Sequence, residues 1–120
     1  MTLKECYAVL GGGYEDVLGR LGSERLVKRF VLKFLDDPSF RMLSEALESE
    51  NYEEAFRASH TIKGICQNLS FMHLLESSSR LTEELRPGTA PASDEFFAQV
   101  TADYSAAAEA IRQYRDSATA

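Results

Sequence analysis

Hydrophobic residues recur at spacings of three and four along most of this chain, which is the periodicity of amphipathic helices. The pattern predicts short helices over 3–10 and 14–21, separated by a glycine triplet. Ser23 is the N-cap candidate of a longer helix, whose apolar positions are Leu26, Val27, Phe30, Val31, Phe34 and Leu35. No sustained alternating run of β-branched residues indicates a strand.

A polar, proline-containing break at 36–38 separates this helix from the next. Ser39 is expected to cap that next helix, whose buried positions are Phe40, Leu43, Ala46 and Leu47. A polar run ends it, and Asn51 with Glu54 three residues later predicts a capping-box-like start for a helix over 52–69.

Two further helices complete the predicted fold. The first begins at Ser70 or Phe71 and ends before a loop at 87–92 that is rich in proline and glycine. Ser93 is expected to cap the last helix, in which an apolar seam is formed by Phe97, Val100, Tyr104, Ala107, Ile111 and Tyr114.

Short connections make neighbouring amphipathic helices antiparallel. We therefore predict an all-α fold, an up-down-up-down antiparallel four-helix bundle with additional short N-terminal helices. Residues 1–120 are expected to form a single domain, with an N-terminal helical extension at 1–22 and the helical bundle at 23–117. A chain of 120 residues with 44% hydrophobic content is enough for one packed core.

Composition excludes several classes of function. The net charge of −6 argues against general nucleic-acid binding, for which a basic face is expected. No apolar run approaches the ~18 residues of a membrane span, and the first ten residues do not resemble a signal peptide, so a cytoplasmic location is expected. Two cysteines, Cys6 and Cys66, are too few and too far apart for a disulfide framework or a zinc site.

The strongest chemical signal is one helical turn that contains His60, Lys63 and Gly64. Their i, i+3 and i+4 spacing places all three on adjacent parts of one helix surface. A neutral imidazole is a good nucleophile near neutral pH, and a lysine one turn away offers a mobile positive charge for phosphoryl oxygens. Glycine inside a helix costs roughly 0.5–1 kcal/mol relative to alanine, and close approach of another protein would explain it.

The orientation of this turn follows from the helical wheel. The apolar side of the helix over 52–69 is formed by Tyr52, Ala55, Phe56, Ile62, Cys66 and Leu69, with the small Ser59 on the same side. At about 100° per residue, His60 lies roughly 115° from the centre of this side and Lys63 lies at its border. His60 is therefore predicted to be exposed or half-exposed, in a row with Arg57, Gly64 and Gln67.

Because of these residues, the segment 23–86 resembles a histidine-containing phosphotransfer (HPt) domain, the phosphoryl carrier of bacterial two-component phosphorelays. The resemblance covers the helices before the turn, the turn itself, and Asn68, Leu69 and Leu74 after it. Ser70 stands where the family commonly has glycine, and Ser59 and Ile65 replace a commoner alanine and a small polar residue. Ser70 is expected to cap the following helix instead.

The resemblance implies that His60 is the phosphorylated nucleophile and that Lys63 stabilises the phosphate. It also implies that Gly64 leaves clearance for a receiver domain, with Arg57 and Gln67 as further partner-binding positions. Arg57 and Lys63 would form a local positive patch facing the acidic metal pocket of that partner.

The partners implied are response-regulator receiver domains, with a hybrid histidine kinase as a further candidate, and the chain is expected to be a monomer. It would need no cofactor or metal of its own, because Mg²⁺ is expected in the partner receiver. The sequence has no phosphate-binding loop of a kinase, so a phosphoryl carrier rather than an enzyme is expected.

Other interpretations use the same residues. A non-catalytic helical-bundle adaptor would bind partners without phosphotransfer, and an independent enzyme would use His60 as a general base. A metal site would need His60, His73, Cys66 and Cys6 together, without the compact spacing of zinc sites. Cys66 is instead predicted to be a buried thiol, and His73 a surface or boundary residue.

Overall fold

The computed structural model of the protein describes residues 1–89 and 93–118, and within them the chain forms helices and turns with no strand. The all-α prediction is therefore confirmed. The helices are α1 (Leu3–Val9), α2 (Tyr14–Leu21), α3 (Glu24–Lys33), the 3-10 helix η1 (Phe34–Asp36), α4 (Ser39–Glu48), α5 (Tyr52–Leu69), α6 (Met72–Leu85) and α7 (Asp94–Ala118). Residues 90–92 of the predicted loop lie outside the described residues.

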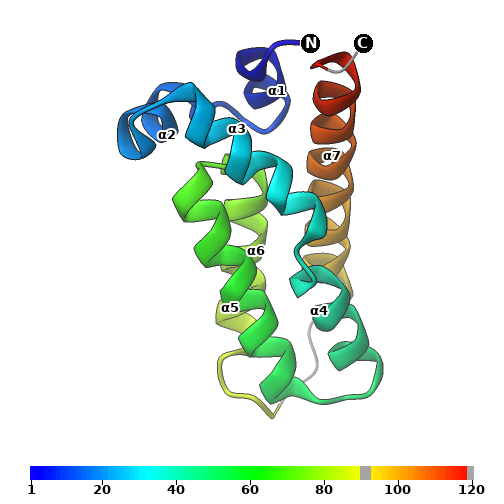
Figure 1. The fold of residues 1–120 in the computed structure, drawn as a ribbon. Helices are drawn as coiled ribbons and strands as arrows, with labels where there is room; N and C mark the ends of the chain where they lie inside the picture. The colour runs from blue at the N-terminus through cyan, green and yellow to red at the C-terminus, as the bar shows by residue number, and fades with distance from the viewer. Residues whose placement is uncertain (90–92, 119–120) are drawn as a thin grey trace.

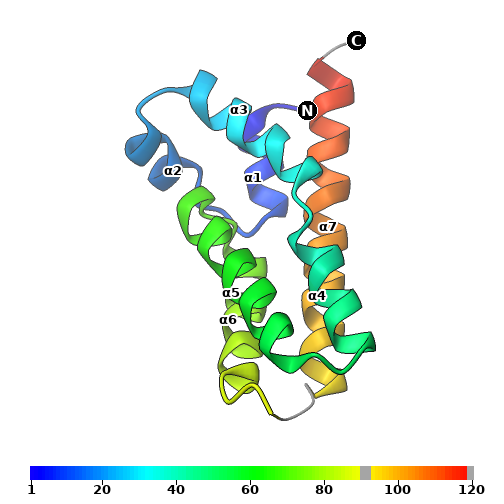
Figure 2. The same cartoon turned by 60° about the horizontal axis from the view of Figure 1, so that its bottom comes forward.

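Helices α4 to α7 pack against one another in chain order. Helix α5 packs against α4 on one side and α6 on the other, and α6 packs against α7. Each of these helices runs back along the one before it (Figure 1). Helices α1, α2 and α3 gather at the end of the molecule where α5 ends, and α1 lies against the C-terminal part of α7 in both views (Figure 2).

Three of the predicted caps begin their helices. The Ser23 hydroxyl accepts a hydrogen bond from the backbone N–H of Leu26 at 3.2 Å, and the Asn51 side chain accepts one from Glu54 at 3.3 Å. The Ser93 hydroxyl accepts in the same way from Phe96 at 3.2 Å. Each satisfies a backbone donor that has no partner inside its helix.

Ser39 does not cap α4, contrary to the prediction. It is the first residue of the helix, and its own backbone N–H donates to the carboxylate of Asp37 at 2.8 Å. Pro38 lies between them and has no N–H to satisfy. The Asp37 side chain therefore supplies the hydrogen-bond acceptor at the start of α4 that was predicted to come from Ser39.

The core draws side chains from every helix of the described chain. The largest fully buried side chains are Tyr7, Phe71, Leu3, Leu43, Leu74, Leu81, Leu85, Ile111, Val17, Val27, Val31 and Val100. Phe40 of α4 stacks on Tyr104 of α7, with ring centroids 4.2 Å apart. Leu26, predicted on the apolar stripe, is 38% exposed because Val27 beside it takes the inward position.

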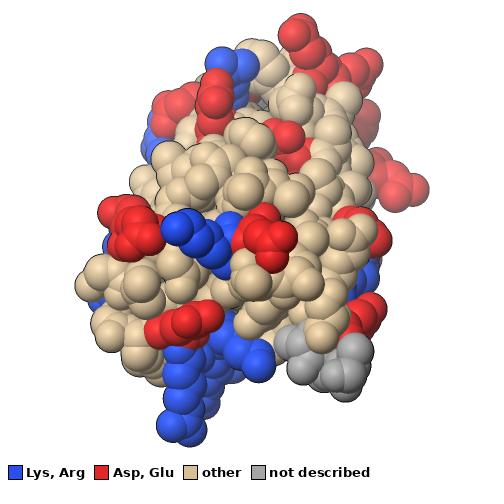
Figure 3. Space-filling model, turned by 90° about the horizontal axis from the view of Figure 1, so that it is seen from above, with Lys and Arg blue, Asp and Glu red and all other residues tan. Residues whose placement is uncertain are grey.

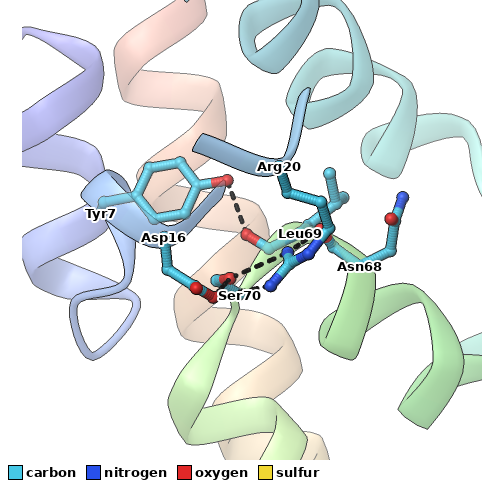
Figure 4. Close-up of polar contacts among 6 residues, drawn as sticks. All are labelled: Tyr7, Asp16, Arg20, Asn68, Leu69 and Ser70. Atoms are coloured by element: carbon cyan, nitrogen blue, oxygen red, sulfur yellow. Dashed lines mark hydrogen bonds and ion pairs between the residues drawn. The ribbon is translucent and has the colours of Figure 1, made fainter. Parts of the chain in front are cut away.

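The junction between α5 and α6 also differs from the prediction. Ser70 ends α5 in the left-handed conformation, with φ 59° and ψ 42°, and does not cap α6, which begins at Met72. Its hydroxyl donates to the Asp16 carboxylate at 2.7 Å and accepts from the Arg20 guanidinium at 3.2 Å (Figure 4). A left-handed conformation is usually taken by glycine, so Ser70 keeps the geometry expected of glycine and adds two hydrogen bonds.

The N-terminal helices bind the last turn of α5. The Tyr7 hydroxyl donates to the carbonyl oxygen of Leu69 at 2.8 Å, and Arg20 donates to that of Asn68 at 2.6 Å (Figure 4). These carbonyl oxygens lie in the last turn of the helix, where carbonyl acceptors have no backbone N–H donor within the helix. Helices α1 and α2 therefore complete the hydrogen bonding of α5 from outside it.

The same contacts affect ionisation. The hydrogen bond from Ser70, together with Arg20, holds the pKa of the Asp16 carboxyl below its ordinary value. Since the pKa is lowered in the folded state, the stabilisation is present above the unfolded pKa of ~3.9 and is lost as the pH falls through the lower folded pKa.

The outer surface of this end carries acidic and basic side chains in an interspersed pattern rather than a basic face (Figure 3). Among the described residues, no helix combines the length and the apolar character that crossing a bilayer requires.

The Ser70 junction gives a test of stability. Ser70→Ala should lower the free energy of unfolding by roughly 1–2 kcal/mol, because it removes a buried hydroxyl bound on both sides and leaves the left-handed backbone in place. Ser70→Gly should lower it less, since glycine removes a backbone strain of about 1 kcal/mol. Urea unfolding of the two variants measures the difference. Equal losses would contradict the proposed strain at this position.

Candidate functional site

The two faces of α5 divide its residues between core and solvent. The buried face is formed by Ala55, Ala58, Ser59, Ile62, Cys66 and Leu69. His60 and Gly64 are exposed and Lys63 is half-buried, with Arg57 and Gln67 exposed in the same row. The structure thus places the predicted site residues on one outward surface of α5, as the helical wheel indicated.

A pair of hydroxyls joins α5 to α6 directly behind this surface. Ser59 Oγ lies 2.7 Å from Thr82 Oγ1, and Thr82 donates to the carbonyl oxygen of Ser78 at 2.6 Å. The Thr82 proton is therefore already used, so Ser59 is the donor to Thr82. Both side chains are fully buried. This contact fixes the turn of α5 from which His60 projects outward.

Phe56 is the nearest aromatic neighbour of the His60 ring. It lies one helical turn earlier, and the two rings are nearly parallel, with centroids 5.9 Å apart and an interplanar angle of 17°. The guanidinium carbon of Arg86, at the end of α6, lies 5.3 Å from the centroid of the same Phe56 ring. Phe56 therefore restricts the imidazole on one side and connects it to a cation on the neighbouring helix.

Arg86 is held in turn by Glu83. Its Nε donates to Glu83 Oε2 at 3.0 Å and its Nη2 donates to Oε1 at 2.6 Å. These hydrogen bonds lower the pKa of the Glu83 carboxyl, and the positive charge of Lys63 lowers it further. The same pair raises the pKa of Arg86.

Sequence reasoning missed three of these neighbours. Phe56 was assigned only to the apolar side of its helix, although its i, i+4 spacing from His60 was a usable signal. Glu83 and Arg86 lie on the next helix, and nothing in their local sequence indicates which face of α5 they approach.

The predicted positive patch of Arg57 and Lys63 is weaker than expected. Arg57 forms an ion pair with Glu54 one turn earlier on α5, and the charges of Lys63 and the Glu83 carboxylate act on each other, which lowers the pKa of Glu83. The surface around His60 therefore has charges of both signs.

Gly64 has open space where a side chain would be. A Cβ added to it would meet no atom within 4 Å, so internal packing does not require glycine here. Its cost in helix stability is therefore not offset by any contact inside this chain. Gly19 on α2 is equally open, which makes it a suitable comparison.

The residues of the alternative metal site do not come together. Cys6 and Cys66 are buried free thiols, and burial raises the pKa of Cys66 to about 12 and that of Cys6 to about 11. His73 is exposed on α6. Within residues 1–89 and 93–118, no group of three or more His, Cys, Asp or Glu side chains is arranged to hold a metal ion.

Comparison with known proteins gives one match. The family model described as the Hpt domain matches residues 38–110, which is more than half of the chain. The matched segment contains α4, α5 and α6 and most of α7, with His60, Lys63 and Gly64 inside it. No curated protein and no solved structure matches the chain significantly.

Proposed function

Because the chain belongs to the Hpt domain family, we propose that His60 is its phosphorylated residue, accepting a phosphoryl group from one receiver-domain aspartate and passing it to another. Members of this family carry phosphoryl groups in phosphorelays and interact with receiver domains; they are carriers rather than enzymes. The observation that carries the assignment is the exposed His60 beside an unobstructed Gly64, within the matched segment.

The transfer is a single in-line displacement. The unprotonated nitrogen of the neutral His60 ring attacks the phosphorus of the aspartyl phosphate. The new N–P bond forms as the O–P bond breaks, and the aspartate carboxylate leaves with the electron pair. The other ring nitrogen then releases its proton to water. Passing the group to a second receiver aspartate reverses these steps.

Charge on the transferred group is shared between the two proteins. The phosphoryl oxygens carry most of the charge in the loose transition state, where fixed cations lower its energy. Lys63 contributes one such cation from this chain, while Mg²⁺ and the remaining charge belong to the partner receiver. The chain itself needs neither a metal nor an ATP site for this step.

Helices α4 to α7 would form the antiparallel four-helix unit of the domain. In this arrangement a receiver approaches the outward face of α5, with Gly64 giving clearance and Arg57 and Gln67 at the edge of the contact. The carrier would act as a cytoplasmic monomer, and a hybrid histidine kinase is the expected source of some phosphoryl groups.

The first prediction concerns the acceptor itself. Incubation with phosphorylated receiver domains should give an acid-labile, base-stable phosphate on the wild-type protein. His60→Gln should lose this phosphate completely and keep its helical content, because glutamine is a good helix former at an exposed site. His73→Gln, which changes the other histidine, should still accept the group. Phosphate on His73 in the His60→Gln variant would refute the assignment.

The second prediction concerns Lys63. Lys63→Ala should slow transfer by about one to two orders of magnitude, since the partner supplies most of the stabilisation of the transition state. Rapid-quench measurement of transfer from a receiver tests this. Lys28→Ala removes an exposed lysine of α3 and should leave the rate unchanged. If the two variants transfer alike, Lys63 is only a surface charge.

The third prediction separates a carrier from a passive adaptor and uses two open glycines. Gly64→Leu and Gly19→Leu should each keep or slightly raise thermal stability, because leucine is the better helix former by several tenths of a kcal/mol. Only Gly64→Leu should abolish transfer from receivers, since its side chain holds the partner away from His60.

Phosphoramidate, a small phosphoryl donor, should still phosphorylate His60 in the Gly64→Leu variant because it needs no protein interface. Unfolding of that variant would instead mean that Gly64 serves internal packing. Unchanged transfer from receivers would place the docking surface elsewhere, and receiver binding without any transfer by the wild type would favour the adaptor.

A further inference from the structure

On α6, one carboxylate is bound to a cation that lies over the aromatic neighbour of His60. Glu83 binds Arg86 through both carboxylate oxygens, at 2.6 and 3.0 Å, and Arg86 lies over the Phe56 ring that packs on His60. The positive charge of Lys63 on α5 also acts on the Glu83 carboxyl and lowers its pKa. Arg86 is thus already bound to an internal anion, and the charge of Lys63 acts on that same anion.

We propose that Glu83 competes with the phosphoryl group on His60 for Arg86 and Lys63, and so keeps that group weakly held and transferable. This inference rests on the proposed function of His60. It assigns Glu83 a regulatory role at the same site, without contact to the reacting atoms.

The competition follows from the charges involved. A phosphoryl group brings a charge of about −1.5 to −2 and three strong acceptor oxygens, and arginine binds such oxygens as readily as it binds a carboxylate. Arg86 is on a long, flexible side chain that is 53% exposed, so it can leave Glu83 when a stronger anion forms nearby. While Glu83 stays ionised, it draws Arg86 back and repels the phosphoryl group.

A carrier needs this balance more than an enzyme does. A group that only binds the phosphorylated state tightly would trap the phosphoryl group and oppose its release to the next receiver. A carboxylate that offsets part of this positive charge weakens the binding of the phosphoryl group to the carrier. Most of the positive charge that stabilises the transferred group then comes from the partner, whose cations act only while the two proteins are bound.

The chain supplies a matched control on the same helix. Glu76 and Arg80 form an exposed ion pair at 2.9 Å, with side chains 68% and 61% exposed, similar to the Glu83–Arg86 pair. Both residues line a groove of about 350 Å³ between α6 and α7, together with Gln99 and other residues, whereas Arg86 lies against Phe56 of α5. Glu76→Gln therefore removes the same charge from the same helix, away from His60.

The test uses protein phosphorylated with phosphoramidate and follows the phosphohistidine by ³¹P NMR as the pH is varied. Removing a nearby negative charge favours the dianionic phosphoryl group, so Glu83→Gln should move its titration to lower pH. The expected change in the acid dissociation constant is about threefold to tenfold, and high salt should reduce it because both side chains are exposed. Arg86→Gln should move the titration to higher pH.

Glu76→Gln should titrate like the wild type. If Glu83→Gln also titrates like the wild type, or if Arg86→Gln moves the titration to lower pH, the competition is overturned. Failure of the wild-type protein to accept phosphate at His60 would instead contradict the proposed function. The two failures are therefore distinguishable in one series of samples.

Discussion

The fold depends on one constraint: a single turn of α5 must bury one face against α4 and α6 and expose the opposite face to solvent. Ser59 and His60 are adjacent in sequence, yet the first is fully buried and the second is exposed. The buried side of this turn is held by the hydrogen bond from Ser59 to Thr82 on α6. A hydroxyl pair fixes both the spacing and the rotation of the two helices, since its geometry is more directional than apolar contact.

The end of α5 is held by a different part of the chain. Helices α1 and α2 lie outside the segment matched by the family, and they supply Tyr7 and Arg20 to the carbonyls of the last turn. Ser70 takes the left-handed conformation there, and Gly13 of the preceding segment approaches so closely that an added Cβ would lie 2.6 Å from the Ser70 carbonyl oxygen. The N-terminal helices therefore act as a clamp on the helix that carries His60.

These two regions mark what the sequence could predict. Exposure of His60, the bounds of α5 and the cap at Asn51 depend on residues within one or two helical turns, so helical periodicity was sufficient. The role of Ser70 depends on Asp16 and Arg20, and the neighbours of His60 include Arg86 from another helix. Such contacts follow from tertiary packing, which no local pattern specifies. The prediction that Ser39 caps α4 was wrong for a local reason: Asp37, two residues earlier, is an equally suitable acceptor.

The charges around His60 suggest how the work of transfer is divided between the two proteins. The two arginines around the imidazole each form an ion pair with a carboxylate, Arg57 with Glu54 and Arg86 with Glu83. Exposed pairs of this kind contribute little to stability, so stability alone does not account for their position. Under the proposed function, a surface with charges of both signs would bind neither free phosphate nor its own phosphohistidine strongly, and it would select partners by shape at Gly64 more than by charge. The strong electrostatic groups would then belong to the receiver, so that transfer would proceed in either direction, as the proposed role of a carrier between two receivers requires.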